Sequence, residues 1–242
     1  RSEFLALSEK DKYPFRPEKL ENISTNQDET KPYISFDGNT ALFVRKVKQR
    51  SKNEESFYQQ TSFITKDVLC QAFLEFNEDL GIWEFDEGFP INEFDNVVNK
   101  PTKVSLTADN KQMYFSYLDK ASGKYQIYCS HSVGGVWSKP ENIGNIVNDV
   151  TANLVDPFIT ADGNTLYFSS DKKGGQGGYD IWVTHKSKNS SWLKPTNLGK
   201  RINTPRNETS PYLHADNNSF YFSSNGWKGF GDMDLFYLDL NN

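Results

Sequence analysis

A sequence unit that recurs four times constrains the fold of this chain more than any other feature. Its clearest copies span residues 156–170 and 210–224, and weaker copies span 31–44 and 102–116. Each copy has a turn aspartate six residues before a phenylalanine that ends an aromatic or hydrophobic run. The turn aspartates are Asp37, Asp109, Asp162 and Asp216. Repeats at this period predict an architecture in which copies of one structural unit stack on each other.

Each unit has a second half. An alternating segment follows the aromatic run, at residues 71–75, 125–129, 179–183 and 233–237, and in three units a tryptophan and a short apolar tail come next. Asp-Gly and Asn-rich pairs suit tight hairpin turns. Aromatic and β-branched residues fit the pleated surface of strands. The pattern therefore predicts an all-β chain, a β-propeller whose blades are four-stranded meanders.

The spacing predicts one propeller domain over residues 1–242, with units at about 28–99, 100–152, 153–206 and 207–242. The last unit stops after its third strand and has no tryptophan tail. Residues 15–20 resemble the tail of the other units, so we expect the N-terminal segment 1–27 to supply the missing strand and close a ring of four blades. Closure would remove exposed sheet edges. An additional strand at residues 4–7 leaves a five-bladed or incomplete ring as the alternative.

Composition excludes several function classes. The net charge is −5 and no basic stripe is present, which argues against binding to nucleic acid. The longest apolar runs are too short to span a bilayer. The chain begins at Arg1, so we expect it to be processed or excised from a longer protein. Cys70 and Cys129 are expected to be free, buried thiols.

The stretch from Ala161 to Asp171, followed by Gly174 to Ile181 and by Trp192, Pro195 and Asn197, resembles the WD40-like propeller repeat. That repeat is a relative of the TolB propeller and is common in Bacteroidetes cell-envelope proteins. The resemblance implies a periplasmic or outer-membrane-associated location and partners among other envelope proteins, in some cases those of type IX secretion. It implies peptidoglycan as a partner only through a flanking domain that this sequence does not contain. The first two units depart from the pattern, because Val104 replaces the proline and Asp109-Asn110 lacks the glycine.

Two equivalent glutamates are candidate binding residues. Glu29 and Glu208 each lie three residues before the proline that opens a first strand. Because first strands line the axis of a propeller, these carboxylates would face a central channel or else accept backbone hydrogen bonds at the start of a blade. With Asp156 they would be candidates for glycoside hydrolysis, which needs two carboxylates at a defined separation.

Two aromatic segments are the other candidates for recognition. Trp227, Lys228 and Phe230 lie in a glycine-rich loop, and an exposed aromatic beside a basic residue is a typical binding anchor. Phe57 and Tyr58 lie in an insertion, Lys46 to Asp67, that interrupts only one unit. The recurrent Trp83, Trp137 and Trp192 are expected to join neighbouring blades.

These observations predict a non-catalytic scaffold that binds proteins, because no catalytic constellation, metal-ligand set or cofactor motif is recognisable. The alternative is a carbohydrate-binding or glycoside-cleaving propeller that uses carboxylates of the central channel. A propeller fold alone cannot decide between them.

Overall fold

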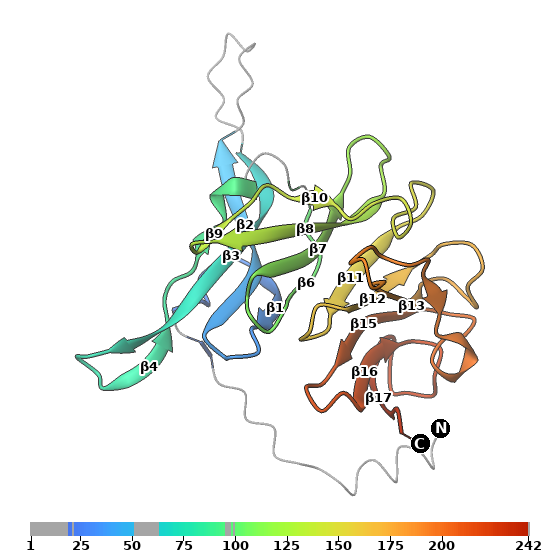
Figure 1. The fold of residues 1–242 in the computed structure, drawn as a ribbon. Helices are drawn as coiled ribbons and strands as arrows, with labels where there is room; N and C mark the ends of the chain where they lie inside the picture. The colour runs from blue at the N-terminus through green and yellow to red at the C-terminus, as the bar shows by residue number, and fades with distance from the viewer. Residues whose placement is uncertain (1–18, 21, 51–62, 95–97, 99, 242) are drawn as a thin grey trace, which may run out of the picture.

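The computed structural model describes residues 19, 20, 22–50, 63–94, 98 and 100–241. They form four antiparallel sheets that follow one another in chain order around a common axis, from the blue first sheet to the red fourth (Figure 1). The prediction of an all-β propeller with four blades is therefore confirmed. The only helical segments among the described residues are two short 3-10 turns, Asn92–Phe94 and Gly199–Arg201.

The first three strands of each sheet pair in sequence order, and we number the sheets as blades 1 to 4. In blades 1 and 2 two short outer strands both pair with the third strand. Blade 1 contains β1 (Glu29–Ile34), β2 (Thr40–Arg50), β3 (Phe63–Asn77), β4 (Ile82–Phe85) and β5 (Phe89–Pro90). Blade 2 contains β6 (Val104–Leu106), β7 (Gln112–Leu118), β8 (Tyr125–Val133), β9 (Val136–Trp137) and β10 (Glu141–Asn142). Blade 3 contains β11 (Leu154–Ile159), β12 (Thr165–Ser170), β13 (Asp180–His185) and β14 (Thr196–Asn197). Blade 4 contains β15 (Glu208–Leu213), β16 (Ser219–Ser224) and β17 (Asp234–Asp239).

The turn between the first two strands has the same construction in each blade. A hydroxyl two residues before the turn aspartate donates to its carboxylate in blades 1 to 3, for example from Thr107 Oγ1 to Asp109 Oδ1 at 2.6 Å. The residue after the aspartate has a positive φ, whether it is Gly163 at 69° or Asn110 at 54°. Asparagine tolerates this left-handed conformation better than most residues, so blade 2 keeps the turn without its glycine.

This turn makes stability depend on pH. The hydrogen bonds from Thr107 and from the Lys111 amide lower the pKa of Asp109. A carboxyl whose folded pKa is lowered stabilises the fold above its unfolded pKa of about 4, and that stabilisation is lost as the pH falls through the folded pKa. We expect Asp109→Asn to lose less stability than the wild type between pH 5 and pH 2, by roughly 0.5 kcal/mol or less because the group is exposed. Urea unfolding at several pH values measures the difference, and parallel curves would contradict it.

The first strands differ according to whether they carry a proline. In blades 1, 3 and 4 the pairing register shifts at Lys31, Asp156 and Ser210, which have φ values of 56°, 50° and 56° and precede Pro32, Pro157 and Pro211. In blade 2, where valine replaces the proline, Val104, Ser105 and Leu106 pair with β7 without a shift. The departure noted in the sequence thus changes the local strand geometry without removing the blade.

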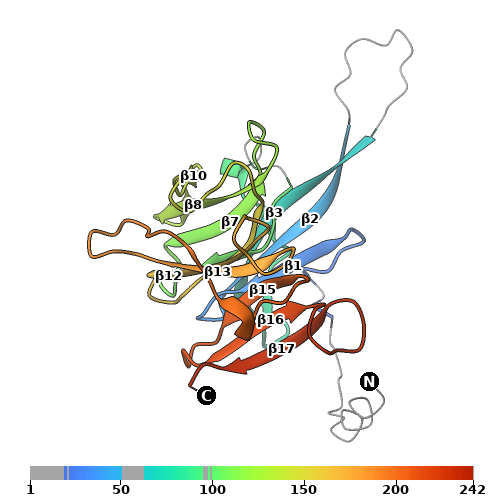
Figure 2. The same ribbon diagram turned by 90° about the vertical axis from the view of Figure 1, so that its right-hand side faces the viewer.

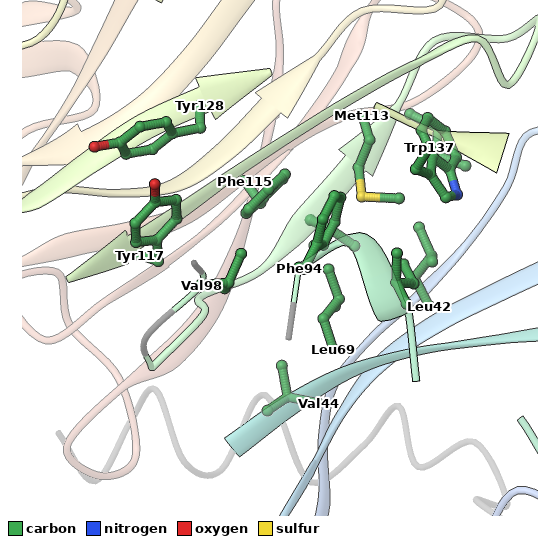
Figure 3. Close-up of a cluster of buried hydrophobic side chains, with 13 residues drawn as sticks. Leu42, Val44, Leu69, Phe94, Val98, Met113, Phe115, Tyr117, Tyr128 and Trp137 are labelled. Atoms are coloured by element: carbon green, nitrogen blue, oxygen red, sulfur yellow. The ribbon is translucent and has the colours of Figure 1, made fainter. Parts of the chain in front are cut away.

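Buried side chains between blades form the core. Figure 3 shows the cluster between blades 1 and 2, in which Leu42, Leu69, Phe94, Met113 and Phe115 meet. A second cluster joins blades 2 and 3, and another joins blades 3 and 4. The remaining cluster contains only blade 1 residues and Ile23. Burial of these large apolar faces is the main force that holds successive blades together.

The outer parts of blade 1 differ from the other blades. The ends of the predicted insertion extend β2 and β3, so that Lys46 pairs with Asp67 and Arg50 with Phe63. This hairpin projects beyond the other blades (Figure 2). Residues 51–62, which include Phe57 and Tyr58, lie outside the described residues.

The described part of the predicted closing segment lies against blade 1. Asn22 Nδ2 donates to the carbonyl of Phe85 at 2.9 Å, and Ile23 is buried on the same blade. Residues 15–18 lie outside the described residues, and blade 4 has three strands in the part of the chain that the structure describes. The closing strand therefore stays a prediction.

Both cysteines are free and buried, as the sequence indicated. Burial raises the pKa of the Cys70 and Cys129 thiols to about 11 in each case. They act as small apolar residues, Cys129 between blades 2 and 3 and Cys70 in the cluster within blade 1.

Candidate functional site

The two equivalent glutamates hold the start of their blades. Glu208 is fully buried and accepts hydrogen bonds from Thr204 N and Thr204 Oγ1, both at 2.7 Å, and from Ser224 Oγ at 2.6 Å. Glu29 repeats the arrangement, accepting from Thr25 N at 3.2 Å and from Thr25 Oγ1 at 2.6 Å. The carboxylates thus bind the loop four residues upstream, which was one of the two alternatives derived from the sequence.

Arg45 distinguishes the two sites. Its Nε lies 2.9 Å from Glu29 Oε1, and its other nitrogens donate to the carbonyls of Ile23, Glu87 and Gly88. Burial alone would raise the pKa of Glu29, but the hydrogen bonds from Thr25 and Arg45 lower it below its ordinary value. Glu29 is therefore an ionised partner of Arg45 that fastens the residues preceding β1 to blade 1.

A cavity of about 280 Å³ lies on the axis, where the first strands of all four blades meet. Its lining includes Tyr33, Val104, Phe158 and Tyr212, together with the charged residues Lys103 and Asp156. Of the three carboxylates considered for glycoside hydrolysis, only Asp156 lines this cavity. Glu29 lines a different cavity on blade 1, and both oxygens of Glu208 accept hydrogen bonds from its own blade and the preceding loop.

Hydrogen bonds at both ends hold the Trp227 loop in place. Trp227 Nε1 donates to the Ile202 carbonyl at 2.8 Å, while the residue remains 42% exposed. Phe230 is 48% exposed, and its amide donates to Asp234 Oδ2 at 2.8 Å. Lys228 is the third residue of this predicted site and lies between them in the loop. Asp180 accepts the equivalent bond from the Gln176 amide in blade 3, so each of these aspartates holds the glycine-rich loop of its own blade.

The recurrent tryptophans divide into two groups. Trp137 Nε1 donates to Gln71 Oε1 of blade 1 at 2.7 Å, and Trp192 lies edge-on to Tyr114 of blade 2 with ring centroids 6.0 Å apart. These two join neighbouring blades, as predicted. Trp83 does not: it is 66% exposed and stacks at a tilt on Phe76 of its own blade, with centroids 5.4 Å apart.

The hairpin of β4 and the end of β3, residues 73–85, is a surface that sequence reasoning missed; we call it the arm. It extends away from the other blades (Figure 1). Phe76 pairs with Trp83 and Leu74 with Phe85, which puts these four side chains on one face of the arm. Phe76, Leu80, Ile82 and Trp83 are between 49% and 66% exposed.

The arm is also strongly acidic. The arm contains Glu75, Glu78, Asp79 and Glu84, and the wider segment between Val68 and Asn99 contains eight acidic residues and no lysine, arginine or histidine. Because the net charge of the whole chain is only −5, the rest of the chain has a slight positive excess. This charge segregation beside repeated aromatic residues was visible in the sequence and marks the arm as unlike the other blades.

No metal centre is recognisable in the part of the chain that the structure describes, since no three His, Cys, Asp or Glu side chains gather there in a way that could hold an ion. Within the same residues no helix is long and apolar enough to cross a bilayer. His185 Nδ1 lies 3.0 Å from Thr165 Oγ1, and His214 lies beside Asp216 at 3.1 Å. These histidines serve local contacts.

Comparison with known proteins supports the fold. No protein-family model matches the chain, and no curated protein matches it. Among solved structures, TolB from Acinetobacter baumannii is 16% identical with a TM-score of 0.52, over 91% of this chain and 43% of TolB. A β-xylosidase is 13% identical with a TM-score of 0.52, over 93% of this chain and 77% of that enzyme. A puromycin-hydrolyzing peptidase from Mycobacterium tuberculosis is 13% identical with a TM-score of 0.50, over 89% of this chain and 30% of that enzyme.

The chain thus spans less than half the length of TolB. TolB, the xylosidase and the peptidase are different kinds of protein, so the similarity shows a shared fold and not a shared function. The fold is a TolB-like β-propeller.

Proposed function

We propose that this chain is a non-catalytic propeller scaffold that binds other proteins in a bacterial cell envelope, in the periplasm or at the outer membrane. The observation that carries the proposal is the arm, which exposes Phe76 and Trp83 side by side on a β-hairpin. Exposed aromatic residues are enriched among the anchors of protein interfaces. The envelope location rests on the repeat resemblance and on the fold shared with TolB.

The partner surface should be apolar with basic residues around it. The acidic residues of the arm would steer such a surface into contact and disfavour acidic partners. The Trp227 loop and the insertion at 46–67 are further contact regions of the same scaffold. Type IX secretion proteins are partners that the repeat resemblance suggests, and peptidoglycan would be reached through a flanking domain.

The carbohydrate-active alternative has weaker support. Asp156 is the one acidic residue among those that line the axial cavity, whereas glycoside hydrolysis generally uses two carboxyl groups about 5–9.5 Å apart. We therefore expect no turnover of aryl glycosides and no retention on a glycan array. Hydrolysis that disappears in Asp156→Asn would overturn the non-catalytic assignment.

The arm is tested by chemical cross-linking in the bacterium that produces the protein. We expect the double variant Phe76→Ser and Trp83→Ser to reduce the yield of its cross-linked envelope partner at least tenfold, which corresponds to about 1.4 kcal/mol of lost binding energy. Val136→Ser is the matched control, because Val136 is 58% exposed on blade 2. Equal yields from the wild type and the double variant would contradict the role of the arm.

A further inference from the structure

One repeat position supplies a polar residue from each blade to the strands next to the axis. It directly precedes the proline of the first strand or, in blade 2, the valine that replaces it, and its residues are Lys31, Lys103, Asp156 and Ser210. In blades 1, 3 and 4 this residue has a positive φ between 50° and 56°. Residues other than glycine rarely keep this conformation, and those that do are concentrated at ligand sites. The position therefore merits a search for a ligand.

Two of these four side chains make internal contacts. Lys31 Nζ donates to the carbonyl of Pro101 at 2.7 Å, and Ser210 Oγ donates to Asp156 Oδ2 at 3.3 Å. The other two residues, Lys103 and Asp156, line the axial cavity of about 280 Å³. The cavity therefore presents one ammonium group and one carboxylate, which come from blades 2 and 3.

These two opposite charges do not neutralise each other. No ion pair joins Lys103 to Asp156 within the described ranges, although both residues line one cavity and both are half-buried. In the same part of the chain, Lys103 Nζ and Asp156 Oδ1 form no hydrogen bond. Partly desolvated charges gain from a partner of opposite sign. A ligand that carries both a negative and a positive group can supply a partner to each.

The walls of the cavity are apolar and held in place. Phe158 is buried and lies edge-on to Tyr212, with ring centroids 5.0 Å apart. Tyr33 is fixed by its hydroxyl, which donates to the carbonyl of Leu106 at 3.3 Å. Three prolines complete much of the lining, namely Pro32, Pro157 and Pro211. A preformed apolar cavity with a few placed polar groups is typical of small-molecule sites.

Size and access restrict the class of ligand. Pockets for drug-sized ligands measure about 300–1,000 Å³, so a cavity of about 280 Å³ suits a smaller molecule. Ile34 and Tyr212 line it and are 46% and 39% exposed, which shows that the cavity is open to solvent. A neutral sugar would leave both charges unpaired, and a simple organic acid would leave Asp156 unpaired.

We propose that the axial cavity binds a free α-amino acid with a large apolar side chain. The carboxylate of the ligand pairs with Lys103, its ammonium group pairs with Asp156, and its side chain packs against Phe158 and Tyr212. This site is separate from the arm, because none of the residues that line the cavity belongs to residues 73–85. It gives the chain a small-molecule ligand in addition to protein partners.

Isothermal titration calorimetry on the full chain tests the site with three matched probes. L-Phenylalanine carries both charges, N-acetyl-L-phenylalanine lacks the ammonium group, and L-phenylalanine amide lacks the carboxylate. We expect saturable binding of phenylalanine and an affinity at least tenfold lower for each derivative, because each loses one charged contact. Absence of saturable binding of phenylalanine and leucine, or equal binding of all three probes, would overturn the proposal.

Two variants assign the charged contacts. Lys103→Gln should weaken binding of phenylalanine at least tenfold and leave that of the amide unchanged. Asp156→Asn should weaken binding of phenylalanine by a similar factor and leave that of the N-acetyl derivative unchanged, and asparagine tolerates the positive φ at this position. If either variant weakens phenylalanine and its matched derivative equally, the assigned contact is wrong.

Two controls separate this site from the rest of the surface. Lys111→Gln removes an exposed lysine of the same blade as Lys103 and should leave the affinity for phenylalanine as it is in the wild type. The double variant Phe76→Ser and Trp83→Ser should also bind phenylalanine normally, because the arm lies outside the cavity. A tenfold loss in either control would contradict an axial site.

Discussion

Replacing Phe168 by alanine is expected to lower the free energy of unfolding by about 3–5 kcal/mol. Phe168 is fully buried between blades 2 and 3, in a cluster with Leu154, Ile159 and Leu166. Truncation removes the apolar surface of the ring and leaves a cavity that the two rigid sheets cannot easily close, so both terms of the cost apply. Urea unfolding followed by tryptophan fluorescence measures the change.

The matched control is Val133→Ala. Val133 is 78% exposed at the end of β8, and we expect its truncation to change stability by less than about 0.5 kcal/mol. A loss below about 1 kcal/mol for Phe168→Ala would contradict the close packing of blades 2 and 3.

Glu208→Ala is expected to cost about 3 kcal/mol or more, a large effect for a polar residue. The carboxylate is fully buried and accepts from Thr204 N, Thr204 Oγ1 and Ser224 Oγ. Removing it leaves the buried Ser224 hydroxyl and the half-buried Thr204 donors without their acceptor, and a buried unsatisfied group costs about 1–3 kcal/mol. Thermal unfolding of the variant should show a clearly lower Tm.

Two comparisons separate this role from ligand binding. Glu208→Gln keeps one acceptor oxygen and should lose less stability than Glu208→Ala. Glu29→Ala should also cost less, because the side chain of Glu29 is 15% exposed and Arg45 keeps its bonds to backbone carbonyls. If Glu208→Ala unfolds at the wild-type temperature, the carboxylate is not holding the blade and a role in ligand binding has to be reconsidered.

Local sequence was sufficient to predict the blades. The spacing of six residues from the turn aspartate to the phenylalanine recurs because the hairpin geometry needs it, and Asn110 meets the same backbone requirement as Gly163. The burial of the thiols and the contacts of Trp137 and Trp192 followed from residue type and repeat position. The turns depend on residues within one unit, and the tryptophan contacts recur between neighbouring units, so both can be predicted from the repeat.

The candidate site was harder to predict, because residues at equivalent repeat positions differ in their contacts and in their exposure to solvent. Glu29 and Glu208 look alike in sequence, and hydrogen bonding at the start of a blade was one of two alternatives for both. Trp83 occupies the same repeat position as Trp137 and Trp192, yet it is exposed because no described blade lies on that side of blade 1. The aromatic arm forms because β3 continues to Asn77 and pairs with β4. The polar insertion before β3 made the length of this strand hard to predict from the sequence.

The sequence by itself determined an all-β propeller built from four repeated units, since turn chemistry and strand pattern are local properties that recur in each unit. Only the tertiary structure decided which faces are covered, which carboxylates are used internally and which aromatics reach solvent. The use of Glu208 depends on its contacts with Thr204 and Ser224. Which faces are covered depends on how the blades sit around the axis, and no single repeat encodes that arrangement. The physical reason is that each repeat specifies the apolar faces of its own blade, whereas those faces are buried only where a neighbouring blade packs against them.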